Sequence, residues 1–154
     1  MKALLSTIVF IILNFLALAI GGFYTGDGVS SSWYQELNKA PWTPPGWLFG
    51  VAWTLIMICF AIYMAQLYIR IKKRTLLLVL FFIQWILNVA WNPVFFYFRD
   101  VEVALVLIAL LTGLIGVLMF KYFGILKKYS ILILPYFIWL LIATSLNLYI
   151  YLYS

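Results

Sequence analysis

The sequence predicts an all-α protein, an integral membrane bundle of five transmembrane helices formed by a single domain. Hydrophobic residues make up 68% of the 154 residues and charged residues only 9%, whereas a soluble domain is about half apolar and a quarter charged. The chain also contains five apolar runs of about 20 residues, the length that a helix needs to cross a hydrocarbon core about 30 Å thick. Finally, the basic residues gather between these runs rather than along them.

The bounds of the expected helices follow from where the apolar runs stop. The first run follows Lys2 but is too long for a signal peptide and lacks a small-x-small cleavage site, so we retain it as a helix. Gly26-Asp27-Gly28 and Ser30-Ser31-Ser32 are typical of turns and predict that the first helix ends before them. The expected helices cover residues 4–23, 46–69, 76–96, 101–123 and 131–153, and an ordered loop covers residues 25–45.

The longest polar interruption in the first half of the chain is the stretch from Trp33 to Trp53, WYQELNKAPWTPPGWLFGVAW. It contains four of the seven tryptophans and three of the five prolines. Proline fixes its own φ and disfavours helix in the residue before it. Thr43-Pro44-Pro45 therefore predicts an ordered, non-helical start to the second helix, and the stretch as a whole is expected to form a stiff roof over the bundle.

The basic residues predict how the protein lies in the cell membrane. Assigning the helix ends alternately to two sides leaves only Lys39 and Arg99 on one side. The other eight share the opposite side: Lys2, Arg70, Lys72, Lys73, Arg74, Lys121, Lys127 and Lys128. By the positive-inside rule the N-terminus is cytoplasmic and the C-terminus, after five spans, lies outside. The net charge of +6 thus reflects membrane topology, and no nucleic-acid partner is expected.

Several chemistries are excluded by the residue types that the chain lacks. It has no histidine and one cysteine, Cys59, which lies inside an apolar run. The only carboxylates are Asp27, Glu36, Asp100 and Glu102. This composition offers no metal cluster, no nucleophile–base pair and no usual axial haem ligand. We expect neither hydrolytic catalysis nor a covalently bound cofactor.

Polar and aromatic side chains recur at helical spacing in three of the runs. Gln84, Asn88 and Asn92 are spaced by four, so they share one face of their helix. Amides facing lipid are costly, and two interpretations stay open: hydrogen bonds between helices, or the lining of a ligand site. The other two faces are Trp139, Ala143 and Asn147 in the fifth run, and Trp53, Met57, Phe60 and Met64 in the second. Together the three faces predict a recess shared by these helices.

Three ordered blocks resemble the TspO/translocator protein family, also called the peripheral-type benzodiazepine receptor. The first block is Trp33-Tyr34-x-x-Leu37-x-Lys39 followed by Trp42-x-Pro44-Pro45-x-Trp47 and Trp53. The second is Gln84-x-x-x-Asn88-x-x-Trp91-x-Pro93-x-Phe95-Phe96. The third is Pro135-Tyr136-x-x-Trp139-x-x-x-Ala143-Thr144-x-x-Asn147. The resemblance covers nearly the whole chain.

The resemblance implies a pocket beneath the loop between the first two helices. In the family it takes flat aromatic molecules such as protoporphyrin IX, and synthetic isoquinoline carboxamide or benzodiazepine ligands. The matching ligand-binding residues are Tyr34, Pro44, Pro45, Trp53, Asn88, Trp91, Trp139, Ala143 and Asn147. Members are also associated with light- and oxygen-dependent breakdown of porphyrin, which implies catalytic roles for Trp53 and Trp139. Homodimers are implied as well, and Ala109 and Gly113 form one small-xxx-small pair that would suit such contact.

Two other functions remain open, transport of tetrapyrroles or other apolar solutes, and ligand sensing through partner proteins. Transport has little support, because the sequence shows no internal repeat and no coupling carboxylate or histidine within the runs. A sterol motif that ends mammalian members is not matched, since no basic residue follows Asn147. A formal match at Leu118, Tyr122 and Lys127 is of a kind that occurs often by chance.

Overall fold

The computed structural model describes all 154 residues and contains helices only. The five long helices are α1 (Lys2–Val29), α3 (Gly46–Arg70), α4 (Thr75–Asn92), α5 (Val101–Lys121) and α7 (Leu134–Tyr153). Shorter elements are α2 (Ser32–Gln35), the π-helix η1 (Pro93–Tyr97) that continues α4, α6 (Phe123–Leu126) and the 3₁₀-helix η2 (Lys127–Leu132). All five long elements are long and apolar enough to cross a membrane, which confirms the expected fold class.

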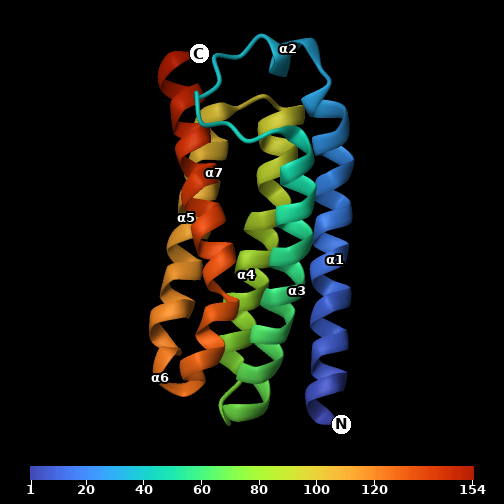
Figure 1. Ribbon diagram of the computed structural model, residues 1–154, viewed down its shortest axis with the longest axis vertical. Coiled ribbons are helices and arrows are strands. Elements are labelled where there is room, and N and C mark those ends of the chain that lie inside the picture. Colours follow the sequence, from blue (N-terminus) through green and yellow to red (C-terminus); the bar gives the residue numbers. More distant parts are fainter.

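The long helices form a ring around a common interior. α1 packs against α3 and α4, α4 against α5, and α5 against α7, while α7 approaches α3 to close the ring. The N-terminus lies at the end of the bundle that also holds α6, whereas the C-terminus, α2 and the segment leading into α3 lie at the opposite end (Figure 1). The largest fully buried side chains include Tyr63 of α3, Phe81 of α4 and Tyr136 of α7.

Small residues, Ala17 and Gly21, let α1 approach its neighbours closely. Both residues are buried, and a Cβ atom added at Gly21 would lie 2.6 Å from Nδ2 of Asn92. Asn14, also buried, donates from Nδ2 to the carbonyl oxygen of Met57 at 3.0 Å. This bond satisfies an amide that would otherwise face hydrocarbon.

The expected end of the first helix was wrong, because α1 continues through Gly26-Asp27-Gly28 to Val29. The reason is a tertiary contact: a Cβ atom at Gly28 would lie 2.2 Å from Cδ1 of Phe96, so only glycine permits η1 to pack here. Burial against this ring outweighs the low helix propensity of glycine. The turn chemistry acts later, where Ser31 caps α2 by accepting a hydrogen bond from the Tyr34 backbone N–H at 3.3 Å.

The last two spans are shorter than expected, and a compact turn joins them. α5 ends at Lys121 and α7 begins at Leu134, with Pro135 in its first turn, where proline needs no backbone donor. α6 and η2 fill the interval, and Lys127 adopts a φ of 48° between them. At Pro93 the helix is not interrupted but widens into η1, because proline removes one donor and Phe98 N–H reaches back to the Pro93 carbonyl at 2.9 Å.

Candidate functional site

The roof of the bundle is the segment 36–45, and it is attached to the end of α7. Pro45 has extended backbone angles (φ −62°, ψ 151°) and forms the N-cap of α3, as the proline pattern predicted. Trp42 donates from Nε1 to Oγ of Ser145 at 3.0 Å. Asn38 accounts for two further bonds, from its backbone N–H to Oγ of Ser154 and from Nδ2 to the carbonyl of Tyr153, both at 2.7 Å. The roof therefore spans the bundle from α2 to α7.

Tyr34 lies in α2, just before the roof, and connects it to η1. Its ring centroid lies 5.6 Å from that of Phe96 and 6.4 Å from that of Phe95. The Lys39 ammonium lies 4.8 Å from the centroid of the same ring, a cation–π distance. Burial raises the pKa of the Tyr34 phenol above its ordinary value, so this side chain is neutral at physiological pH.

Amide side chains bind α4 to α7, and one of them, Gln84, belongs to the predicted amide stripe of α4, which is Gln84, Asn88 and Asn92. Trp91 donates from Nε1 to Oδ1 of Asn147 at 3.0 Å, and Nδ2 of Asn147 donates to the carbonyl of Val101 at 3.1 Å. Deeper in the bundle, the Tyr136 hydroxyl donates to Oε1 of the buried Gln84 at 2.8 Å. For Gln84, the interpretation as hydrogen bonding between helices is therefore the one that holds in this structure, and Asn147 of α7 is paired in the same way.

The remaining two amides of the stripe differ from each other. Asn92 faces α1, where its Oδ1 accepts from the Thr25 hydroxyl at 2.6 Å, and its Nδ2 donates to the Asn88 carbonyl at 3.4 Å. The half-buried Asn88 side chain makes no hydrogen bond of its own within the chain. Asn88 is thus the member of the stripe whose amide is free to bind something else.

The aromatic residues of α3 and α7 meet edge to face. The ring centroids of Trp53 and Tyr136 are 6.0 Å apart, and those of Phe49 and Trp139 are 5.4 Å apart. Trp139 is 7% exposed, yet its Nε1 has no hydrogen-bond partner. The half-buried Ala143 lies one turn along α7 and packs against the same core. A buried, unpaired indole N–H therefore lies one turn from a small residue on α7.

The predicted site residues are divided between the main hydrophobic core, a smaller cluster and the roof. Trp53, Trp91, Trp139 and Ala143 all pack against the main hydrophobic core. Tyr34 packs instead against a smaller cluster that includes Phe95 and Phe96, and Trp91 touches both clusters. Pro44 and Pro45 lie in the roof, where Pro45 is exposed. We keep the name inner recess for the predicted group of Trp53, Asn88, Trp91, Trp139, Ala143 and Asn147. None of the six lines either of the two cavities described below.

Sequence reasoning did not assign site roles to Gln84, Tyr136 and Phe49. Gln84 and Tyr136 form the buried bond just described, and Phe49 packs on the Trp139 ring. The signal for Gln84 and Tyr136 was present, since Gln84 begins the amide stripe and Tyr136 lies one turn before Trp139. Nothing in the sequence distinguished Phe49 from the other phenylalanines of its helix.

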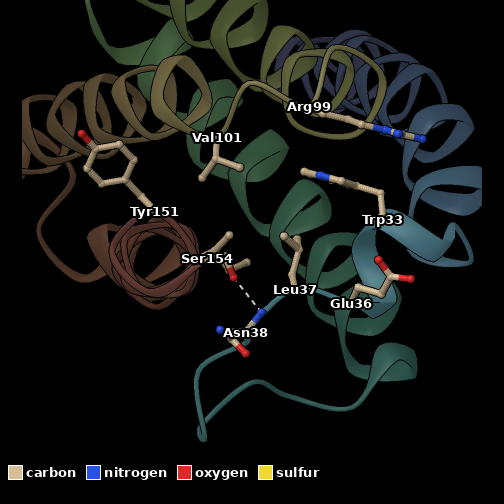
Figure 2. A pocket seen from close by; sticks show the side chains of 9 residues that line it. Trp33, Glu36, Leu37, Asn38, Arg99, Val101, Tyr151 and Ser154 are labelled. Atoms are coloured by element: carbon tan, nitrogen blue, oxygen red, sulfur yellow. Dashed lines mark hydrogen bonds between the residues drawn. The ribbon is translucent and has the colours of Figure 1, made fainter.

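A cleft of about 430 Å³ opens beside the roof, between α2 and the ends of α5 and α7. Its lining is Trp33, Glu36, Leu37, Asn38, Arg99, Val101, Ile150, Tyr151 and Ser154. Figure 2 shows Asn38 and Ser154 joined across the cleft by their hydrogen bond, with Trp33 and Arg99 on its far side. Val101 borders this outer cleft and also accepts from Asn147, so the cleft adjoins the inner recess.

Comparison with known proteins places the chain among proteins of one family. The family model described as TspO/MBR matches residues 9–152. Similar proteins include the tryptophan-rich protein TspO of Archaeoglobus fulgidus, 37% identical over 153 residues that cover 92% of each chain. The tryptophan-rich sensory protein of Cereibacter sphaeroides is 32% identical, covering 88% of this chain and 85% of its own. The human translocator protein is 31% identical, covering 81% and 75%. The chain belongs to the TspO/MBR family.

Proposed function

We propose that the protein binds protoporphyrin IX or a related tetrapyrrole in the inner recess and promotes its photo-oxidative degradation. The observation that carries this proposal is the buried Trp139 Nε1, which has no partner. A buried donor without an acceptor costs about 1–3 kcal/mol, and a ligand with an acceptor atom at this point would remove that cost. The free amide of Asn88 would add a second polar contact.

The residues around Trp139 suit a flat, largely apolar ring. Aromatic side chains from α3 and α7 supply broad apolar surfaces, and ligand sites are typically apolar with a few placed polar groups. A metal-free macrocycle needs no axial ligand, and the chain has no histidine to supply one. Trp53 and Trp139 would contact the ring, while the roof would limit access of water.

In the proposed reaction the pigment supplies light absorption and dioxygen is the oxidant. The protein contributes position, because it holds the indoles of Trp53 and Trp139 against the bound ring. The absence of a nucleophile–base pair is consistent with this division of work. Replacing either indole should therefore slow degradation without preventing folding.

Illumination of the purified protein with protoporphyrin IX tests the proposal. We expect the pigment to be consumed faster than in detergent alone, and more slowly with Trp53→Phe and Trp139→Phe. Trp47→Phe is the matched control, because Trp47 is 70% exposed and lies outside the recess. Equal rates with wild type, both variants and detergent would refute the degradation role. Titration by tryptophan fluorescence quenching measures binding separately, and synthetic isoquinoline carboxamides or benzodiazepines should compete in it.

Transport or sensing is the second candidate, and one observation favours it. The roof is bound to α7 through exposed hydrogen bonds of Asn38 and Trp42, so it can open without breaking the core. The relatives called sensory protein and translocator protein have names that fit this candidate. Proteoliposomes test it: protein-dependent uptake of protoporphyrin IX in the dark, lost on fixing the roof by a disulfide between Asn38→Cys and Ser154→Cys, would favour passage over degradation.

A further inference from the structure

A second concave surface, which shares no lining residue with the inner recess, lies on the outer side of the bundle between α5 and α7. It is a groove of about 590 Å³ lined by Thr112, Gly113, Gly116, Val117, Phe120, Lys121 and Phe137. Gly113 forms an open part of it, since a Cβ atom added there would meet nothing within 4 Å. Val117 and Phe120 are 52% and 75% exposed. In a membrane-spanning helix these side chains face hydrocarbon.

The groove offers apolar surface along its length and a cation at one end. Its only hydroxyl, that of Thr112, already donates to the Ile108 carbonyl at 2.7 Å and lies 3.0 Å from the Thr144 hydroxyl. It is therefore not available to a ligand. Lys121 lines the last turn of α5. Its ammonium lies 5.7 Å from the Tyr122 ring centroid, a contact that leaves its protons free for an anion.

The length of the groove matches one leaflet of a bilayer. Thr112 and Lys121 are nine residues apart, which on a helix is about 13.5 Å. Half of a hydrocarbon core about 30 Å thick is about 15 Å. With Lys121 at the level of the head groups, the groove therefore ends near the bilayer midplane, where an acyl chain of the same leaflet also ends.

The charge distribution selects the head group. Lys121 lies at the end of the bundle where eight of the ten basic residues gather, while all four carboxylates lie at or near the opposite end, in the sequence around the roof and the α4–α5 connection. No carboxylate therefore competes for the Lys121 ammonium. Basic residues beside membrane helices attract anionic lipid with about 1 kcal/mol each.

We propose that this groove binds one anionic phospholipid, with an acyl chain along Gly113, Gly116 and Val117 and the head-group phosphate on Lys121. The site is independent of the inner recess and of any tetrapyrrole. Two contributions determine its affinity, shape from the glycines and charge from the lysine. Each can be removed by a separate substitution.

Native mass spectrometry of the purified protein tests the site, with phosphatidylglycerol and phosphatidylcholine of identical acyl chains as probes. We expect wild type to prefer phosphatidylglycerol, and Lys121→Gln to lower that affinity about fivefold. Gly113→Leu should fill the groove and lower the affinity for both lipids. Lys72→Gln is the matched control, because Lys72 is basic and exposed at the same end but does not line the groove.

Three outcomes would overturn the proposal. The first is equal affinity of the wild type for the two lipids. The second is a loss of phosphatidylglycerol affinity with Lys72→Gln as large as that with Lys121→Gln, which would indicate diffuse attraction. Conversion of a dimer into a monomer by Gly113→Leu, with lipid affinity unchanged, would assign the groove to a second copy of this chain. Because Lys121→Gln changes only a surface charge, it keeps the test valid if Gly113→Leu does not fold.

Discussion

At the scale of single residues, the polar side chains inside the spans fall into two groups. Gln84, Trp91 and Asn147 each make a hydrogen bond to a neighbouring helix. These bonds join α4 to α7 and α7 to α5. Trp139 has no such partner, although it is nearly as buried. A paired group contributes to stability, whereas an unpaired one weakens it, so the two groups respond differently to substitution.

Tyr136→Phe tests the paired group. Removal of the hydroxyl leaves Gln84 Oε1 buried without a donor, and we expect a loss of about 1 kcal/mol in unfolding free energy. Trp139→Phe should lower the free energy of unfolding by less than Tyr136→Phe does, because the Trp139 N–H makes no hydrogen bond that the substitution could remove. Reversible unfolding in mixed detergent measures both, with Tyr151→Phe, at a 46% exposed position, as the control. Equal losses for Tyr136→Phe and Tyr151→Phe would contradict the assignment.

Tyr34 predicts a dependence of stability on alkaline pH. Its pKa is raised by burial in the folded protein, whereas in the unfolded chain a tyrosine ionises near pH 10. Above about pH 10 the unfolded chain has released this proton and the folded chain has not, so stability falls as pH rises. Tyr34→Phe should show a shallower fall between about pH 9 and 11. Denaturation midpoints across that range measure it, and identical slopes in the two proteins would exclude the effect.

At the scale of elements, the contact between α1 and η1 decides where the first span ends. Gly28 lets the Phe96 ring approach the α1 backbone, and η1 in turn supports Tyr34 and Trp33 of α2 through Phe95 and Phe96. The π-helical turn after Pro93 places these rings toward α1 and α2. The position of the roof therefore depends on a glycine in α1 and a proline in the α4 extension.

Gly28→Ala should disturb this arrangement. Because the added Cβ would overlap the Phe96 ring, which cannot move without displacing Tyr34, we expect a destabilisation of roughly 1–3 kcal/mol. Gly26→Ala is the matched control, since nothing lies within 4 Å of its Cβ position, and it should gain up to about 1 kcal/mol of helix propensity. Thermal unfolding compares the two variants. A Gly28→Ala protein as stable as Gly26→Ala would mean that Phe96 is free to move.

At the scale of the whole molecule, the two ends of the bundle differ in their charge and in the elements that they contain. One end holds α6 and the N-terminus, and the other holds α2 and the C-terminus (Figure 1). Most of the basic residues belong to the first end, whereas the roof and the outer cleft belong to the second. This asymmetry is what the positive-inside rule uses to orient a membrane protein. We propose that the basic end is cytoplasmic and that the roof faces outward.

Labelling of intact cells with a membrane-impermeant maleimide checks this orientation. In a Cys59→Ala background, Ser154→Cys should react because it lies at the roof, whereas Lys72→Cys should react only after the membrane is permeabilised. Both positions are exposed, so access to the reagent and not burial decides the result. The reverse pattern would place the N-terminus outside.

Much of this architecture follows from local information, and the boundaries that did not follow share one physical cause. The five spans and the non-helical prolines could be predicted, because hydropathy and proline geometry act within one segment. The end of α1 and the short elements between α5 and α7 depend on contacts with segments distant in sequence, because Phe96 lies against Gly28 and both α6 and η2 pack on α3.

The candidate site divides in the same way. The amide stripe showed that Gln84, Asn88 and Asn92 share a face, but it could not tell which amides pair with other helices and which stays free. That depends on the positions of α1 and α7 around α4: Asn92 meets Thr25, Gln84 meets Tyr136, and Asn88 meets neither.

The sequence by itself determined that the chain is a five-span membrane protein of a tryptophan-rich family with a proline-stiffened loop. These properties depend on composition and order, which the chain has before it folds. Only the tertiary structure decided that Trp139 keeps an unpaired N–H and that a groove lies beside Lys121. Both result from which helices become neighbours, because a hydrogen-bond partner or a groove exists only between segments that folding brings together.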